Sequence, residues 1–213
     1  MPITSVLAAL SMASALCAIA CEWPKRRRAF YLFKPLTTVL VAGYALTAAA
    51  PTSFYPLVVL IALGFCLIGD IALMFDGNPP FIVGLSSFLI AHLLFAGAFL
   101  HGLPQWAFGH YALAGLVFGV VGLAILLPRA GPLRPAIVAY VVVLIGMWLA
   151  ADARFALLAD DASRFALIGA TVFIASDSLL AWNRFVRPLP PPLAQPLILG
   201  TYFPAILLIA MSV

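Results

Sequence analysis

The chain has 213 residues, of which 65% are hydrophobic and only 8% are charged, and its mean hydropathy is +1.17. Soluble domains carry about 25% charged residues, so this composition excludes a water-soluble globular protein. The formal net charge is +4, and four of the eleven basic residues form one run at 25–28. That run precedes an apolar segment, so it indicates membrane topology and predicts no nucleic-acid partner.

Eight apolar segments are long enough to cross a bilayer as helices, which takes about 20 residues with a range of about 17 to 25. In chain order we expect them at 3–21, 30–49, 56–75, 81–101, 106–127, 136–152, 162–182 and 194–213. The sixth is the shortest. The breaks between them fall at Pro24, Pro51 to Pro56, Asp76 to Pro80, Pro104, Pro128 to Pro135, Asp160-Asp161 and Pro188 to Pro192. The sequence predicts a single all-α integral membrane domain over 1–213, a bundle of about eight transmembrane helices.

The first segment has no Lys or Arg before it, which favours a retained helix over a cleaved signal peptide. The same absence argues against a lipoprotein signal that ends at Cys21. Cys17, Cys21 and Cys66 lie in or beside apolar segments, without a CxxC pair or the Cys and His spacing of a zinc site. We interpret them as small membrane-helix residues.

Loop charges predict the topology. The loops after the first, third, fifth and seventh segments carry Lys25, Arg26, Arg27, Arg28, Arg129, Arg134, Arg184 and Arg187. The opposite loops carry only two cations beside three acids, namely Arg154, Arg164, Asp152, Asp160 and Asp161. The positive-inside rule therefore places both termini outside, in the periplasm if the membrane is a bacterial inner membrane.

Three ionisable residues stand out at bilayer depth inside apolar segments, where each charge costs about 2.5–3.5 kcal/mol on insertion scales. They are Lys34, Asp70 and Asp177, and His92 is a fourth, less costly polar group. Structural explanations stay open for each of them. Lys34 is near enough to a helix end to snorkel to the interface, either acid can form a buried salt bridge with it, and His92 can be a hydrogen-bonding core residue.

The predicted topology gathers polar side chains from six helices in the cytoplasmic half of the membrane. The candidate site residues are Lys34, Asp70, His92, Tyr140, Asp177, Asn183, Arg184 and Tyr202. The two acids share one depth, His92 lies deeper, and Asn183 and Arg184 lie at the rim. A shared polar cavity that opens toward the cytoplasmic leaflet accounts for them together.

Short motifs recur in the same order in the two halves of the chain. The pairs are Lys34-Pro35 with Arg134-Pro135, Gly69-Asp70 with Ser176-Asp177, and Val83-Gly84 with Leu199-Gly200. They predict a tandem repeat of two four-helix halves related by an axis along the membrane normal.

Five segments carry a family resemblance: KPLTT at 34–38, GDIALM at 69–74, FLIAH at 88–92, SDSLLAWNRF at 176–185 and GTYF at 200–203. In this order they resemble the YhhN family, which includes the eukaryotic lysoplasmalogenases of the TMEM86 type. The resemblance covers most of the chain. One position departs from it, because the family often has Gln four residues after the Tyr of the last motif and this chain has Ile206.

The resemblance implies hydrolysis of the vinyl ether bond of a lysophospholipid, with Asp70 and Asp177 as the catalytic pair. The products are a fatty aldehyde and glycerophosphoethanolamine or glycerophosphocholine. Protonation of the alkenyl carbon gives an oxocarbenium ion, to which water adds before the hemiacetal collapses. Two carboxyl groups can supply the proton, the stabilising charge and the base, much as in glycoside hydrolysis. Which Asp is the acid stays open.

The other candidate residues receive supporting roles in this scheme. Lys34 keeps one acid ionised, while His92, Tyr140 and Tyr202 position water or substrate. Arg184 either binds the lipid phosphate or is only a positive-inside charge. One deep His and two acids are too few for a convincing metal site, so no metal and no other cofactor is expected.

Two other functions fit the same residues. Intramembrane Asp, Lys and His also suit a proton-coupled transporter of a small or lipid-like solute, although no pair of clearly interrupted helices is evident. A non-enzymatic lipid-binding protein is the third possibility. The natural lipid and the oligomeric state are left open by the sequence.

Overall fold

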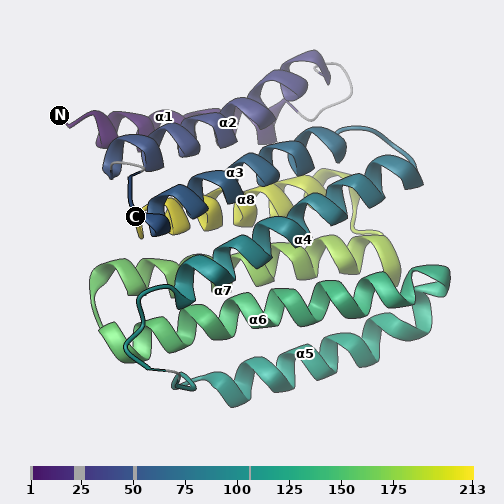
Figure 1. Ribbon diagram of the computed structural model, residues 1–213. Coiled ribbons are helices and arrows are strands. Elements are labelled where there is room, and N and C mark those ends of the chain that lie inside the picture. Colours follow the sequence, from purple (N-terminus) through teal and green to yellow (C-terminus); the bar gives the residue numbers. More distant parts are fainter. Residues whose placement is uncertain (1, 22–26, 50–51, 106) are drawn as a thin grey trace.

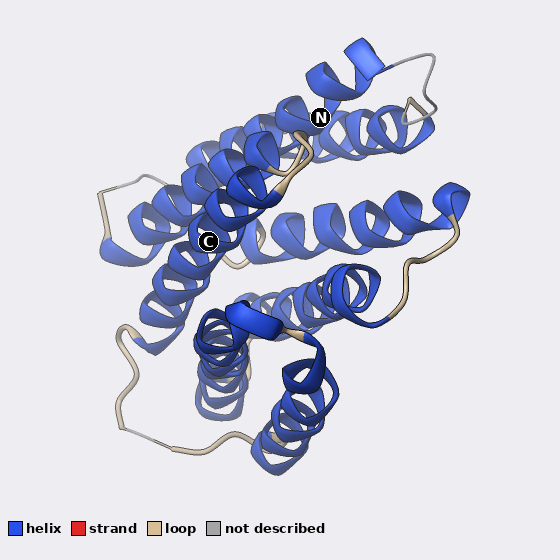
Figure 2. Cartoon of the chain, turned by 90° about the vertical axis from the view of Figure 1, so that its right-hand side faces the viewer, coloured by secondary structure: helices blue, strands red, loops and turns tan. Residues whose placement is uncertain are grey.

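The computed structural model describes residues 2–21, 27–49, 52–105 and 107–213. Its helices are α1 (Ile3–Ala20), α2 (Arg27–Ala48), α3 (Phe54–Ala72), α4 (Asn78–Leu100), α5 (Ala112–Leu126), α6 (Arg134–Leu158), α7 (Asp161–Ala181) and α8 (Pro191–Ala210). Eight spans in the described chain are long and apolar enough to cross a membrane, and all regular structure described there is helical (Figure 2). The predicted all-α membrane bundle is confirmed. Pro24, Lys25, Arg26 and Pro51, used above for a break or for topology, lie outside the described residues.

Successive helices run in opposite directions, and both chain ends lie at the left-hand end of the bundle in Figure 1. Helix α8 packs against α7 and also against α1, α2 and α3, whereas α4 packs against α3 and α6. Helix α5 packs mainly on α6 and forms one edge of the bundle (Figure 1). The ends of α3 and α7 and the starts of α4, α6 and α8 therefore share the right-hand end in Figure 1.

The predicted end of the sixth segment at residue 152 is wrong, because α6 continues to Leu158 and its 25 residues make it the longest helix described. Asp152 and Arg154, which resemble loop charges in the sequence, lie inside it. The Asp152 carboxylate accepts a hydrogen bond from the Tyr111 backbone amide at 2.9 Å. The Arg154 guanidinium donates to the His101 carbonyl at 3.0 Å and lies over the ring of Tyr55. Local partners allow both charges to stay within a helix.

The predicted start of the fifth segment at 106 is also wrong, because α5 begins at Ala112 and has only 15 residues. The preceding loop lies on α6, and Gly109 is so close to Asp152 that a Cβ there would overlap the carboxyl group. A loop held in this way on a neighbouring helix cannot continue the apolar helix that its composition suggests.

Several prolines expected in loops lie in the first turn of a helix instead, namely Pro79, Pro80, Pro191 and Pro192. Pro56, the expected first residue of the third segment, also lies in a first turn. The amides of a first helical turn have no partner within the helix, so proline loses no hydrogen bond there. This explains why α3, α4 and α8 each begin two or three residues before the predicted position.

The turn between α6 and α7 matches the predicted break at Asp160-Asp161. Ala159 ends α6 in the left-handed conformation with a φ of 52°. Asp160 then caps α7 by accepting a hydrogen bond from the Ser163 amide at 2.7 Å. The hydrogen bonds from Ser163 hold the pKa of Asp160 below its ordinary value, so the capping carboxylate stays ionised down to lower pH.

Candidate active site

The Asp70 carboxylate on α3 is fully enclosed by three donors, and the residue is only 1% exposed. Its Oδ2 accepts hydrogen bonds from the Thr38 hydroxyl at 2.5 Å and from the Tyr202 hydroxyl at 2.8 Å. The Lys34 ammonium lies 3.8 Å from Oδ1. Lys34 is 5% exposed, so it forms a buried ion pair and does not snorkel to the interface.

The spacing of the residues on α2 explains how this cluster forms. Lys34 and Thr38 are one helical turn apart and face the same direction. Both side chains therefore reach Asp70 from α2, while Tyr202 reaches it from α8, which packs on α2 and α3. We call Lys34, Thr38, Asp70 and Tyr202 the Asp70 cluster.

The Asp177 carboxylate on α7 has different and fewer partners. The Tyr140 hydroxyl donates to its Oδ2 at 2.7 Å, and the His92 Nε2 atom lies 3.7 Å from the same oxygen. His92 is fully buried, and neither ring nitrogen has a hydrogen-bond partner in the described part of the chain. Its ring packs edge-on against Phe173, with 4.6 Å between centroids. We call His92, Tyr140 and Asp177 the Asp177 cluster.

An aromatic layer joins the two clusters. Phe173 contacts His92 on one side and Tyr202 on the other, with 5.6 Å between the ring centroids of Phe173 and Tyr202. The buried Cys66 thiol interacts with the Tyr202 hydroxyl and lies within the electrostatic influence of both carboxylates. The two acids are therefore neighbours through shared contacts, although each has its own hydrogen-bonding partners.

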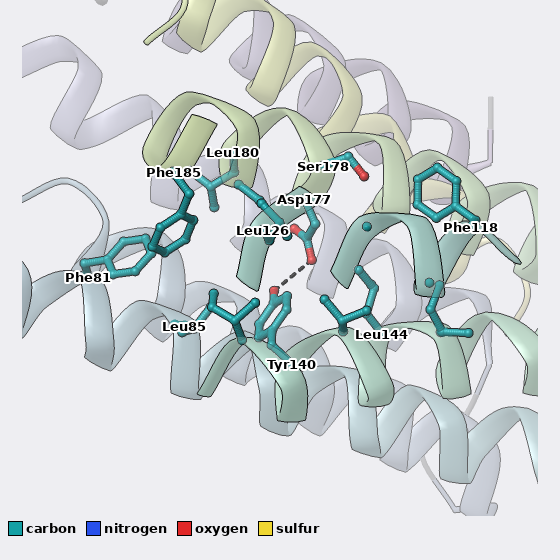
Figure 3. A pocket seen from close by; sticks show the side chains of 16 residues that line it. Phe81, Leu85, Phe118, Leu126, Tyr140, Leu144, Asp177, Ser178, Leu180 and Phe185 are labelled. Carbon is teal, nitrogen blue, oxygen red and sulfur yellow. Dashed lines mark hydrogen bonds between the residues drawn. The ribbon is translucent and has the colours of Figure 1, made fainter. Parts of the chain in front are cut away.

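A pocket of about 620 Å³, including its open mouth, lies beside the Asp177 cluster between α4, α5, α6 and α7. Figure 3 shows Asp177 and Tyr140 at its wall with the hydrogen bond between them. The rest of its lining is apolar apart from Ser178, whose hydroxyl is bonded to the Ile174 carbonyl. Asp70 does not line this pocket. The polar residues predicted to share one cavity therefore divide into two clusters, and the Asp177 cluster borders this pocket.

Asn183 and Arg184 follow α7 in a π-helical turn, η4 (Trp182–Val186). The Asn183 side chain accepts a hydrogen bond from the Leu189 amide at 2.8 Å and so holds the connector to α8. The exposed Arg184 donates to the Asn78 side chain at 2.6 Å, and its guanidinium lies over the Phe81 ring. Since Phe81 lines the pocket, Arg184 lies at the pocket's edge.

Comparison with known proteins extends this description to the family level. The model of the YhhN family matches residues 29–213, which include both clusters and all five of the sequence motifs. The chain belongs to the YhhN family.

The YhhN chain is also similar to curated proteins. It is 32% identical over 212 residues to human lysoplasmalogenase TMEM86B, covering 92% of this chain and 81% of that protein. It is 32% identical to human lysoplasmalogenase TMEM86A over 168 residues, covering 72% of this chain and 64% of the relative. For bovine lysoplasmalogenase TMEM86A the identity is 30% over 175 residues, with 80% and 68% covered. No solved structure matches the chain.

Sequence reasoning did not identify two residues of this YhhN site, Thr38 and Cys66. Each lies one helical turn from a residue that the sequence singled out, Thr38 after Lys34 and Cys66 before Asp70. A search for polar residues four positions from Lys34 or Asp70 would therefore have found both. Ile206, at the position where the family often has Gln, is fully buried one turn beyond Tyr202.

The described residues contain no group of three or more His, Cys, Asp or Glu side chains placed to hold a metal ion. The polar groups that do converge at the site are hydroxyls, an ammonium and two carboxyls. Such groups are suited to proton transfer and charge stabilisation.

Proposed function

We propose that this YhhN-family protein is a hydrolase that cleaves the vinyl ether bond of lyso-ether phospholipids. The products are a fatty aldehyde and glycerophosphoethanolamine or glycerophosphocholine. One observation carries the proposal: a carboxyl group, Asp177, lies at the wall of an otherwise apolar pocket among membrane-spanning helices. The similarity to relatives named lysoplasmalogenases supports the same reaction.

Asp177 is the proposed proton donor. In an apolar wall a neutral carboxyl group costs less to bury than a carboxylate, and only the neutral form carries the proton that the alkenyl carbon needs. The Tyr140 hydroxyl bonded to Oδ2 fixes the orientation of the group and leaves Oδ1 for the substrate. Proton transfer to the alkenyl carbon leaves an oxocarbenium ion facing a carboxylate, which stabilises the new positive charge.

The same residue is the proposed base in the second half of the reaction. Water adds to the oxocarbenium carbon and gives its proton to Asp177, which restores the carboxyl group. The hemiacetal then breaks its bond to the glycerol oxygen, which leaves as an alcohol when it takes the hemiacetal proton. His92 is placed to orient this water, because its Nε2 lies 3.7 Å from Asp177 and the ring has unused hydrogen-bonding capacity among the described residues.

Asp70 has a different proposed role within the pair. Its two oxygens face three donors, so it is suited to remain a carboxylate and is poorly suited to proton transfer. We assign to it a negative charge that stabilises the oxocarbenium ion through the aromatic layer and holds Tyr202 in place. Lys34 keeps this carboxylate ionised.

Arg184 is the proposed contact for the lipid phosphate. Its guanidinium is exposed at the edge of the pocket, and guanidinium groups bind phosphate in a two-pronged geometry.

The basic residues near this end of the bundle, among them Arg129, Arg134 and Arg187, support an orientation with the pocket toward the cytoplasmic leaflet. We accordingly propose a bacterial inner membrane location with both termini in the periplasm.

The direct test is product formation by the purified protein in detergent. Incubation with a panel of lyso-ether lipids should release a fatty aldehyde from the vinyl ether lipids alone, detected by mass spectrometry together with the glycerophospho product. Lyso lipids with a saturated ether are the matched controls, because protonation of a saturated chain gives no oxocarbenium ion. Turnover of the saturated lipids, or of none, would contradict the proposal.

A proton-coupled transporter remains the alternative, favoured by the buried Lys34–Asp70 pair, since such pairs also occur in proton relays. Solute flux across proteoliposomes without lipid turnover would support it.

Replacing His92 with Phe is expected to lower kcat by about 10²-fold or more, the range of contributions typical of a positioned proton-transfer partner. Phe keeps the edge-on ring packing against Phe173 and removes both nitrogens, so the Tm in detergent should change little. The KM should also be nearly unchanged, because His92 is not part of the pocket lining. Unchanged kcat in a folded His92→Phe protein would remove His92 from the reaction.

A further inference from the structure

The pocket at Asp177 continues into a groove along the outside of the bundle between α5 and α7. One neighbouring hollow, of about 530 Å³, shares Phe118, Gly122, Ser178 and Ala181 with the pocket. Another, of about 650 Å³, lies farther along α5 around Gly115 and Thr171, and Phe118 lines it too. Phe118 lines all three hollows, so they follow one another along α5, and we call this row of hollows the α5–α7 groove.

The glycines of α5 face two different surroundings, the neighbouring helix α6 and the open space of the groove. A Cβ on Gly115 would overlap the Trp148 ring, and a Cβ on Gly119 would come within 2.9 Å of Ile145, so α5 packs tightly on α6 there. At Gly122 a Cβ would meet no atom within 4 Å. Gly122 therefore borders open space, between the pocket at Asp177 and the hollow that faces outward.

The groove has the chemistry of a hydrocarbon binding site. Apart from Asp177, Tyr140 and two hydroxyls already bonded to their own helix, those of Ser178 and Thr171, its walls are apolar. Phe118 is 49% exposed, and it lies on α5, the helix that forms one edge of the bundle (Figure 1). From Leu126 to Ala114 the groove follows α5 for about 18 Å, at about 1.5 Å per residue. That length suits one long hydrocarbon chain lying parallel to the helices.

Ordinary contact with bilayer lipid does not account for this shape. A lipid chain against a smooth helix surface stays outside the protein, whereas this groove leads past Gly122 to a carboxyl group. A lysophospholipid has one chain, and its reactive bond joins that chain to the glycerol. A chain lying along the groove would bring this bond to the level of Asp177 while the phosphate points toward Arg184.

We infer that the substrate reaches Asp177 sideways from the bilayer between α5 and α7, that its single chain lies in the α5–α7 groove, and that Gly122 keeps the passage open. This inference rests on the proposed function for the identity of the lipid. Gly122 is thus a specificity-determining position, because any side chain larger than hydrogen projects into the path of the chain.

Photo-crosslinking tests the inference without relying on hydrolysis. The probe is a single-chain lysophospholipid with a saturated ether bond and a diazirine on the chain, added to the full-length protein in lipid nanodiscs. Labelled peptides should come from α5 and α7 and include Phe118. In Gly122→Leu the labelling of these peptides should fall about tenfold or more, since even one misplaced methylene in an apolar site is worth about 10–200-fold.

Gly146→Leu is the matched control. Gly146 is also a membrane-helix glycine at which a Cβ would meet no atom within 4 Å, but it is exposed on α6 and lines none of the three hollows. Its labelling should equal that of the wild type. Gly122→Ala is a second variant with a smaller side chain, and its labelling should fall to an intermediate level. It provides the test if Gly122→Leu does not fold.

Unchanged labelling in folded Gly122→Leu and Gly122→Ala, or wild-type labelling confined to other helices, would overturn the inference. The result is separable from the proposed function. Labelling of α5 and α7 without aldehyde release from vinyl ether lipids would support the groove and reject the hydrolase. Aldehyde release with labelling elsewhere would keep the hydrolase and reject this route.

Discussion

Replacing Asp177 with Asn should lower aldehyde release at least about 10³-fold, within the range that a general acid contributes. Asn has nearly the shape of Asp and can still accept the hydrogen bond from the Tyr140 hydroxyl, so the wall of the pocket should be preserved. It cannot protonate the alkenyl carbon, however, and it cannot take the proton of the attacking water. The measurement is kcat and KM with a vinyl ether lysophospholipid, and the loss should appear in kcat.

Asp161→Asn is the control for this experiment, because it makes the same chemical change on the same helix. Asp161 lies in the first turn of α7, and its exposed side chain pairs only with Arg164, at 3.4 Å, among the residues that the structure describes. The rate of this variant should equal that of the wild type. Full activity in a folded Asp177→Asn protein would remove Asp177 from the proton transfer, whatever the behaviour of the other acid.

The second large effect is expected in the Lys34–Asp70 ion pair. Removing one partner of a buried pair typically costs about 3–5 kcal/mol, because the other charge loses its counter-charge in a medium of low dielectric constant. Lys34→Met and Asp70→Asn should therefore each lower the free energy of unfolding by about this amount. In the double variant neither charge remains, so its loss should be clearly smaller than the sum of the two single losses. Reversible unfolding of the protein in mixed micelles measures these differences.

Activity of the double variant then separates two roles of Asp70. If Asp70 only holds the fold together, aldehyde release should recover with stability. We expect it to stay low, because the negative charge assigned to stabilising the oxocarbenium ion is absent. Single variants as stable as the wild type would contradict the ion pair as a source of stability.

The fold could be predicted well from the sequence because transmembrane helices are defined by long apolar stretches, which are local features. The predicted helix ends were wrong where contacts with residues distant in the sequence determine whether a helix continues. Asp152 and Arg154 look like loop charges, and the partners that keep them in α6 come from the loop at 107–111, the end of α4 and Tyr55 of α3. A single sequence does not reveal those partners.

For the candidate site, the sequence predicted how deep each residue lies in the membrane, but it did not predict which residues its side chain contacts. Counting residues from helix ends predicted that Asp70 and Asp177 lie near the same end of the bundle. It could not predict that Tyr202 contacts Asp70 while Tyr140 contacts Asp177, because this depends on α8 lying against α3 and on which faces of α6 and α7 meet. Likewise, the π-helical turn after α7 directs Asn183 to the connector, which residue counting does not reveal.

The arrangement of these contacts also bears on the predicted tandem repeat. Asp70 is bound from α2 in its own half and from α8 in the other half. Asp177 is bound from α6 in its own half, with His92 approaching from α4 in the other. This exchange is the pattern expected of two related halves. The repeat remains a prediction, which a superposition of α2, α3 and α4 on α6, α7 and α8 would test.

The groove beside α5 has a consequence for the fate of the products. Cleavage would leave the aldehyde in a channel that opens to hydrocarbon, and the glycerophospho fragment near Arg184 at the aqueous boundary. The two fragments then diffuse away in different phases, one in the plane of the membrane and one in water. Recombination would need both to return to the same carboxyl group, so the separation of the fragments into two phases would oppose the reverse reaction.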